Sequence, residues 1–359
     1  MKRAEHGGNI YEIVQRLGIK EEEIIDFSAN INPLGIPKDF KECLLLNINK
    51  IQKYPDPTYK DLIKEISEYH KIDSSWISVG NGATEVIFSM VREIKPKNSL
   101  ILSPTFLEYE RALKKVGSHI EYYELQEKNN FQIEDDFFNK LHDDIDLVIL
   151  CNPNNPTSQL IVKSQMKKIL NICKARNIHL MMDEAFMEFV ENGDQESMIP
   201  LLKDYERMYI IKALTKFYAL PGLRIGYGLS SNMKILKNIR NNQEPWSINS
   251  YAAMAGMVLK DEVYIQKSKE WITKERKRLY EELIKIKTLK VYPPSSNYIL
   301  FKYLGSNKNL KEALLKSKIL IRSCDNYKNL DDSFYRIAIK DKECNLKLLK
   351  ALKEVSYED

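Results

Sequence analysis

Short apolar runs alternate with longer, charged segments of helical periodicity through the middle of the chain. The charged segments predict helices over residues 84–94 and 165–176, and an acidic helical region around 196–204. This alternation is typical of an α/β fold, in which helices cover both faces of a mostly parallel sheet. The apolar runs that we expect to form its buried strands are 76–80, 100–103, 147–151, 179–183, 208–212 and 224–229.

The last hundred residues have a different pattern. A charged helix over 262–286 leads into short strands and helices, which predicts a smaller α+β unit. The strands expected there are 290–292, 298–303, 319–322 and 334–339, and the helices are 310–317 and 345–355. The predicted division is an N-terminal segment packing on the small domain (1–45), a large domain (46–260) and a small domain (261–359). Ligand sites favour the clefts between such domains.

Composition narrows the class of protein. The net charge of +5 comes from 55 basic and 50 acidic residues that are interspersed, which argues against a nucleic-acid surface. No apolar run approaches the ~20 residues that cross a bilayer, and the start lacks the apolar core of a signal peptide. The five cysteines are far apart and lack metal-ligand spacing. We therefore expect reduced thiols, no metal site and a cytoplasmic protein.

A lysine and an arginine suggest chemistry at one turn. Lys216 stands eight residues before Arg224, across Pro221 and Gly222, and apolar segments flank both residues. A lysine among apolar neighbours and cations loses its proton more easily, so it can form a Schiff base with an aldehyde cofactor. The arginine can then neutralise a phosphate on that cofactor. Taken alone, a lysine and an arginine at this spacing are more often two solvated side chains, so the interpretation depends on the other segments.

Two further polar residues follow predicted strands. Asp183 ends one strand. A carboxylate buried there needs a cation, such as a protonated pyridine nitrogen. Alternatively, Asp183 is the N-cap of a following helix. Asn155 lies between Pro153 and Pro156 in the turn after another strand. The prolines can aim its amide at a phenolate oxygen, although Asn-Pro pairs also form ordinary turns.

A glycine-rich segment and several aromatics complete the pattern. Gly82 lies where a strand leads into a helix. The N-terminus of this helix can bind a phosphate. Alternatively, the turn is an ordinary one in which Thr84 caps the helix. Phe106 or Tyr109 can stack on a flat ring or pack in the core, and Tyr54 heads a turn. Each group falls at a strand terminus of one predicted sheet, and this shared position favours a single PLP (pyridoxal 5'-phosphate) site.

Together these residues resemble the fold-type I PLP enzymes of the aspartate aminotransferase superfamily, over almost the whole chain. The resemblance implies PLP as cofactor, bound covalently by Lys216, with Asp183 at the pyridine nitrogen; these two are the expected catalytic residues. It also implies a homodimer, in which Tyr54 reaches a phosphate across the interface. The other cofactor-binding residues implied are Gly82, Ala83, Thr84, Tyr109, Asn155, Thr215 and Arg224.

A narrower resemblance concerns the reaction. The segments around His6, Asn32, Lys216 and Arg322 look like a decarboxylase branch that acts in cobalamin biosynthesis, close to the histidinol-phosphate aminotransferases. It implies PLP-dependent conversion of L-threonine O-3-phosphate to (R)-1-aminopropan-2-yl phosphate. His6, Asn32 and Arg322 are then expected to bind the substrate phosphate, and Arg336 is expected to bind its carboxylate.

Three positions bear on this narrower resemblance. Phe186 stands where the aminotransferase relatives usually carry Tyr, which agrees with it. Ala213 replaces a usual Ser or Thr, so we expect one phosphate hydrogen bond to be missing. Ser158 replaces a usual Gly at the end of the asparagine turn.

Two alternatives stay open. One is an aminotransferase acting on histidinol phosphate or a related phosphorylated amine, because one cofactor geometry serves both reactions. The other is a non-catalytic PLP-binding sensor domain fused to a transcription regulator. We expect no helix-turn-helix segment before residue 1, which disfavours the sensor.

Overall fold

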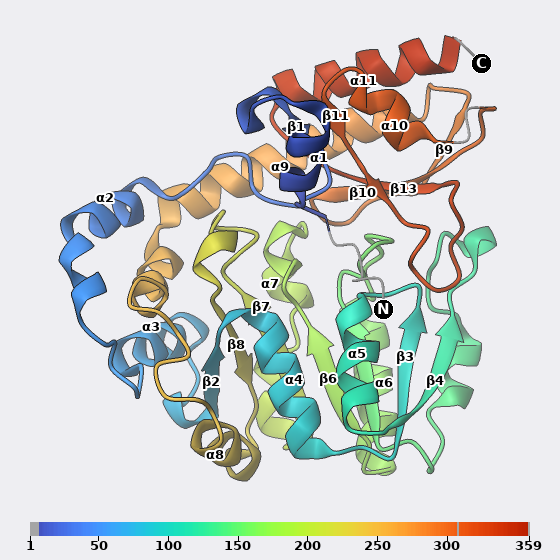
Figure 1. The fold of residues 1–359 in the computed structure, drawn as a ribbon. Coiled ribbons are helices and arrows are strands. Elements are labelled where there is room, and N and C mark those ends of the chain that lie inside the picture. The colour runs from blue at the N-terminus through green and yellow to red at the C-terminus, as the bar shows by residue number, and fades with distance from the viewer. Residues whose placement is uncertain (1–6, 307–308, 358–359) are drawn as a thin grey trace.

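A seven-stranded sheet forms the centre of the computed structural model, which describes residues 7–306 and 309–357 (Figure 1). The strand order is β2-β8-β7-β6-β5-β3-β4, and β8 alone among these strands runs antiparallel to its neighbours. The strands are β2 (Ile77–Gly80), β3 (Asn98–Ser103), β4 (His119–Glu124), β5 (Leu147–Cys151), β6 (His179–Asp183), β7 (Met208–Ala213) and β8 (Gly226–Leu229). The mostly parallel α/β sheet predicted from the sequence is confirmed.

Successive side chains of the central strands point into two separate cores. On β5, Leu147 and Ile149 pack in one apolar cluster, whereas Val148 and Leu150 pack in the other. Helices on both faces therefore complete a three-layer arrangement (Figure 1). The helices associated with this sheet are α3 (Lys60–His70), α4 (Gly82–Ile94), α5 (Leu107–Lys115), α6 (Lys163–Ala175), α7 (Gly193–Glu196) and α8 (Met233–Asn241).

A second, antiparallel sheet of four strands lies above the first in Figure 1, in the order β12-β13-β10-β9. Its strands are β9 (Leu289–Val291), β10 (Tyr298–Tyr303), β12 (Arg322–Ser323) and β13 (Phe334–Ala338). The helices of this unit are α9 (Glu262–Leu283), α10 (Leu310–Leu315) and α11 (Lys342–Tyr357). The α+β pattern predicted for the last hundred residues is thus confirmed.

Several predicted elements were wrong in detail. The strand expected over 319–322 is two strands in different sheets, because β11 (Ile319–Leu320) pairs with β1 (Ile25–Asp26) and β12 joins the four-stranded sheet. The acidic region around 196–204 forms only the short α7 and a 3-10 helix, Ile199–Asp204. Strand β4 was missed because it is an edge strand, mostly half-exposed and rich in polar residues.

The N-terminal segment has contacts in two places. Strand β1 lies against the second unit through β11, next to α1 (Ile10–Leu17). By contrast, α2 (Lys38–Leu46) contacts the 3-10 helix Ala252–Lys260 beside the large sheet. The three-part domain division with boundaries at 45 and 260 stays a prediction.

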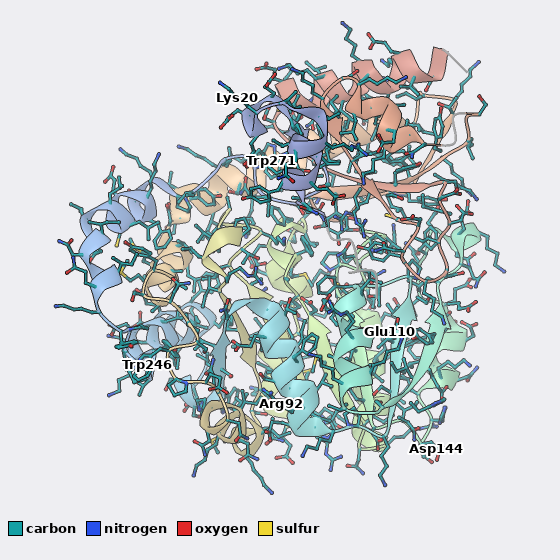
Figure 2. All side chains as sticks on the ribbon, viewed as in Figure 1. Lys20, Arg92, Glu110, Asp144, Trp246 and Trp271 are labelled. Atoms are coloured by element: carbon teal, nitrogen blue, oxygen red, sulfur yellow. The ribbon has the colours of Figure 1, made fainter. Side chains whose placement is uncertain are left out.

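An apolar surface lies around α2 and the 3-10 helix Ile48–Gln52 that follows it. Its exposed side chains are Leu45, Leu46, Ile48 and Ile51. Tyr54 is 79% exposed and stands 4.6 Å, between ring centroids, from Trp246, which Figure 2 labels at the periphery. We call these six residues the apolar face.

Two expectations from composition can be compared with the structure. All five cysteines are free, as expected. Within residues 7–306 and 309–357, no helix has both the length and the apolar character needed to span a bilayer.

Candidate active site

The predicted site residues gather at one edge of the large sheet. Asp183 ends β6, and Lys216 follows the end of β7. Strand β8 runs in the opposite direction, so Arg224, just before its start, lies at the same edge. The sheet topology therefore brings together residues that lie far apart in the sequence, as expected for the carboxyl ends of parallel strands.

Lys216 has an unusual electrostatic environment. Its ammonium group makes no hydrogen bond or ion pair with any described residue. Burial, together with the positive charges of Arg336 and Arg224, lowers the pKa of Lys216 to about 8. A lysine of this kind carries a substantial neutral fraction at physiological pH, which is the form that attacks a carbonyl carbon.

Arg224 lies against the start of α4, with no room to spare. A Cβ added at Gly82, whose φ is +82°, would lie 2.5 Å from Arg224 Nη2. A Cβ at Gly226 would lie 2.3 Å from the backbone nitrogen of Ala83. The guanidinium and the helix N-terminus, including Thr84, thus form a cradle suited to a phosphate.

The asparagine turn after β5 holds its side chain from two directions. Asn155 Oδ1 accepts hydrogen bonds from Arg336 Nη1 and, at 3.4 Å, from the hydroxyl of Tyr327. Asn155 Nδ2 donates to none of the described residues. The amide is therefore fixed through its oxygen and can donate to a ligand.

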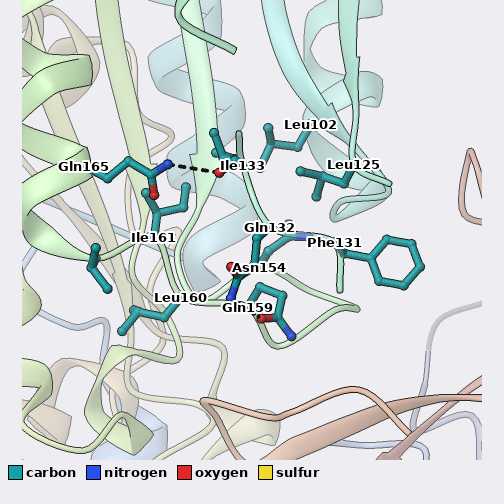
Figure 3. Close-up of a pocket in the computed structure, with 11 residues that line it drawn as sticks. Leu102, Leu125, Phe131, Gln132, Ile133, Asn154, Gln159, Leu160, Ile161 and Gln165 are labelled. Carbon is teal, nitrogen blue, oxygen red and sulfur yellow. Dashed lines mark hydrogen bonds between the residues drawn. The ribbon is translucent and has the colours of Figure 1, made fainter. Parts of the chain in front are cut away.

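Ser158, where a glycine is usual, adopts a left-handed backbone with φ of 61°. Its hydroxyl accepts the backbone N–H groups of Ser295 and Ser296 at 3.2 and 3.0 Å. These bonds offset the strain of a side chain at positive φ and tie the turn to the bend that precedes β10. A cavity of about 110 Å³ lies behind the turn, beside Asn154 and Gln159 (Figure 3).

Asp183 is buried and lacks a cationic partner. No Lys, Arg or His among the described residues lies within ion-pairing distance of its carboxylate. Oδ2 accepts the Tyr109 hydroxyl at 2.7 Å, and Oδ1 accepts the Ala185 N–H at 3.0 Å. Burial raises the pKa of Asp183, although these two bonds oppose the rise. A cation bound next to the carboxylate would compensate the cost of burying it.

Tyr109 is buried next to Asp183. Its side chain has no exposed surface, and its hydroxyl donates to the Asp183 carboxylate. Phe106, three residues earlier, is only partly buried, and the choice between the two aromatics for stacking stays a prediction. The hydroxyl bond to Asp183 is a function that sequence reasoning missed, although the spacing of Phe106 and Tyr109 could have suggested opposite orientations.

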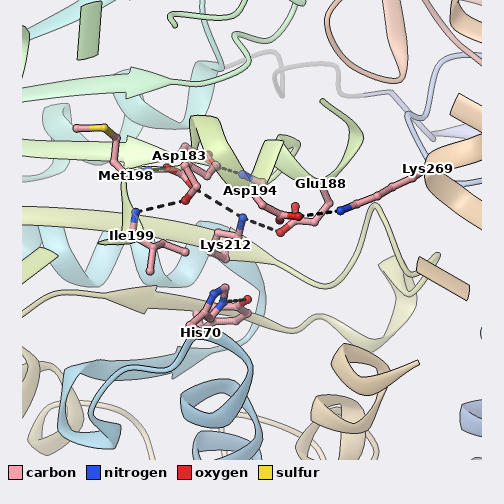
Figure 4. A network of polar contacts seen from close by, with 12 residues as sticks. His70, Asp183, Glu188, Asp194, Met198, Ile199, Lys212 and Lys269 are labelled. Atoms are coloured by element: carbon pink, nitrogen blue, oxygen red, sulfur yellow. Dashed lines mark hydrogen bonds and ion pairs between the residues drawn. The ribbon is translucent and has the colours of Figure 1, made fainter. Parts of the chain in front are cut away.

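A buried ion-pair network includes Glu184, the residue that follows Asp183 (Figure 4). Lys212 Nζ lies 2.6 Å from Glu188 Oε1 and 3.7 Å from Glu184 Oε2, and its side chain is 5% exposed. Burial opposes the charged form, but the two carboxylates outweigh it and raise the pKa of Lys212. This network was not predicted, and it anchors the segment after β6.

Two arginines lie opposite each other in the four-stranded sheet. Arg322 of β12 pairs with Arg336 of β13, and both side chains are buried. Arg336 Nη2 donates to Ser28 O at 2.7 Å, and Arg336 makes no ion pair with a described residue. Like charges directly opposite on one sheet face repel each other, so an anion bound beside them would be stabilising.

Three other predicted residues have different outcomes. Asn32 was expected to bind substrate, but its Nδ2 donates to Phe217 O and Ser268 Oγ, both at 2.8 Å, and its Oδ1 accepts Leu34 N–H at 3.1 Å. These bonds help to fix the segment after Lys216, and the substrate role of Asn32 stays a prediction. Tyr54 is exposed and lies in the apolar face, and His6 lies outside the described residues.

The residues present fit the cofactor predicted from the sequence. Lys216 offers a partly neutral amine, Asp183 a buried carboxylate that needs a cation, and the Arg224 cradle a phosphate site. Those three groups match the aldehyde, the ring nitrogen and the phosphate of PLP.

Comparison with known proteins places these features in a wider group. The family model for aminotransferase class I and II matches residues 22–352. Threonine-phosphate decarboxylase of Salmonella typhimurium is 41% identical over 98% of this chain and 96% of its own length. Histidinol-phosphate aminotransferase of Methanococcus aeolicus is 31% identical, over 96% and 93%. The crystal structure of the histidinol-phosphate aminotransferase from Clostridium acetobutylicum has a TM-score of 0.86 and 40% identity, over 93% and 99%.

Titration of Lys216 tests its environment. The protein free of cofactor is treated with an amine-reactive acylating reagent at a series of pH values. Peptide mass spectrometry measures the extent of Lys216 labelling, which should rise with pH with an apparent pKa of about 8. Labelling of the exposed Lys237 in the same spectra serves as an internal reference. An Arg336→Gln change removes a neighbouring cation and should move the midpoint upward. An unchanged midpoint would contradict the electrostatic explanation.

Removal of the buried cation tests the ion-pair network. Lys212→Met leaves two buried carboxylates uncompensated and should lower the free energy of unfolding by about 3–5 kcal/mol, measured by urea denaturation. The matched control is Lys269→Met, which breaks the more exposed pair with Asp194 and should cost less than about 1 kcal/mol. Equal losses in the two variants would contradict a special role for Lys212.

Proposed function

Because this chain belongs to the aminotransferase class I and II family, we propose that it binds PLP and decarboxylates L-threonine O-3-phosphate. The products are CO2 and (R)-1-aminopropan-2-yl phosphate, which forms when a proton replaces the carboxylate on Cα. The observation that carries the proposal is the cross-strand pair of buried arginines, Arg322 and Arg336. A substrate with a carboxylate at one end and a phosphate at the other supplies one anion for each guanidinium.

In this proposal Arg336 binds the carboxylate and Arg322 the phosphate. Holding both ends fixes the rotation of the substrate about the bonds of Cα, and that rotation decides which of those bonds is broken. Arg336 also contacts Asn155, so the substrate carboxylate is bound next to the residue proposed for the cofactor ring hydroxyl.

When bound, the cofactor withdraws electrons from Cα of the substrate. Asp183 favours a proton on the ring nitrogen, and the Tyr109 hydroxyl holds the carboxylate in place for this purpose. Lys216 would hold the cofactor aldehyde, and its amine, when free, would hold or deliver a proton at Cα. Its pKa of about 8 suits both tasks near neutral pH.

The phosphate of the cofactor is assigned to the Arg224 cradle with Gly82, Ala83, Thr84 and Thr215. Ala213 lies beside this group in place of the usual hydroxyl residue. We therefore propose that the cradle binds its phosphate with one hydrogen bond fewer than in relatives that carry Ser or Thr there.

We further propose that the protein is a cytoplasmic homodimer formed through the apolar face. Leu46 is 85% exposed and Ile51 is 71% exposed, and side chains of this kind are usually buried. In this proposal a second copy seated there brings its Tyr54 toward the site of the first, which agrees with the exposure of Tyr54 in the single chain. The five free thiols support a reducing compartment.

A direct assay separates decarboxylation from transamination. With L-threonine O-3-phosphate and 2-oxoglutarate, we expect one CO2 per aminopropanol phosphate and no glutamate, measured by CO2 capture and amino-acid analysis. Lys216→Ala should lower the rate by at least about 10²–10⁴-fold, because it removes the proton-transfer group. Formation of glutamate without CO2 would contradict the proposal and favour an aminotransferase. Two of the compared proteins are named as aminotransferases.

Mixed dimers test the shared site. Lys216→Ala and Tyr54→Ala should each be nearly inactive alone. After the two variants are unfolded together and refolded, half of the dimers should be mixed and carry one intact site. Activity should then recover to about a quarter of the wild-type value. A mixture as inactive as its parents, with dimers present by sedimentation, would show that Tyr54 serves its own chain.

A further inference from the structure

The loop over residues 324–333, which connects β12 to β13, joins the two arginine-bearing strands. It lies in the four-stranded sheet unit, yet several of its contacts are with the large sheet. We call it the 324–333 loop. None of its residues belongs to the catalytic set proposed above.

One end of the loop is fastened to the carboxyl ends of β3 and β4. Asn329 Nδ2 donates to Leu125 O at 2.9 Å and to Ser103 O at 3.4 Å. Ser103 Oγ donates in return to Lys328 O at 3.1 Å. The ammonium of Lys328 lies 3.9 Å from the centroid of the Tyr122 ring, a cation–π contact. These contacts join the two sheets at the level of the site.

The other end of the loop contacts two residues of the proposed site. Asn326 Oδ1 accepts Arg322 Nη2 at 2.7 Å, and the guanidinium of Arg322 lies 5.6 Å from the centroid of the Tyr327 ring. The hydroxyl of the buried Tyr327 donates to Asn155 Oδ1 at 3.4 Å. Neighbouring residues of one loop thus touch the guanidinium proposed for the substrate phosphate and the amide proposed for the cofactor.

We infer that Asn326 and Tyr327 are positioning residues, which set Arg322 and Asn155 for their ligands while Asn329 ties the loop to the large sheet. This inference rests on the proposed function for the identity of the two ligands. Arginine side chains have many rotamers, and a guanidinium held before binding loses less freedom when the anion arrives. Likewise, a bond to Asn155 Oδ1 leaves the amide hydrogens pointing away from Tyr327, toward the ligand side.

The test uses the PLP-loaded enzyme, whose cofactor phosphate already fills the Arg224 cradle, and inorganic phosphate as the probe in calorimetric titration. Asn326→Ala should raise the Kd for phosphate about tenfold and raise KM with little change in kcat. Tyr327→Phe should change phosphate binding less, and should shift the pH at which the cofactor absorbance changes. Asn329→Ala should increase amide hydrogen exchange across the 324–333 loop and weaken phosphate binding.

Ser333→Ala is the matched control, because the Ser333 hydroxyl contacts only Asp331 among the described residues, within an exposed turn of the same loop. All four variants should melt within a few degrees of the wild type. Asn326→Ala with wild-type phosphate affinity would overturn the inference, as would a wild type that does not bind phosphate. The outcome is separable from the reaction assay, because inorganic phosphate reacts in neither decarboxylation nor transamination.

Discussion

Concentrated positive charge is the constraint on which this site depends. Lys216 lies close enough to Arg336 and Arg224 for their charges to lower its pKa, and Arg322 stands opposite Arg336 in the neighbouring sheet. Such a cluster is costly without anions nearby. In the proposed function three anions offset this cost, namely a cofactor phosphate, a substrate carboxylate and a substrate phosphate. The charges proposed to bind these anions also lower the pKa of the lysine.

The sheet topology explains why such a cluster can form at all. Parallel strands end at one edge, so residues that are distant in the sequence converge there without a special connection. The reversed β8 adds Arg224 to that edge from the opposite direction. The arginines of the second sheet complete the site from above, and contacts such as Asn329 with Leu125 hold the two sheets together.

Much of this arrangement was predictable, for definite reasons. Asp183, Lys216 and Arg224 follow or precede apolar runs, and such runs locate strand ends in the sequence. The side-chain directions were not predictable in the same way. The Tyr109 hydroxyl donates to Asp183, and the Asn32 amide bonds to Phe217, Ser268 and Leu34. Such tertiary hydrogen bonds cannot be read from a motif.

Strand pairing was also beyond the sequence pattern. The sequence pattern predicted one strand over residues 319–322, but Ile321 separates two short strands that pair with β1 and β13 in different sheets. Periodicity reports which residues are buried and carries no information about the pairing partner. The narrow resemblance to decarboxylases came from separate segments of the chain, and composition alone would not have indicated it.

The close packing of Gly82 and Gly226 limits how the phosphate cradle can evolve. A methyl group at either position would collide with Arg224 or with the backbone of Ala83, so neither wall can gain a new side chain. Position 213 pairs directly with Gly226, and its methyl group already occupies permitted space. A side chain that reaches the phosphate cradle is therefore more easily introduced at position 213, which already carries a Cβ, than at either glycine.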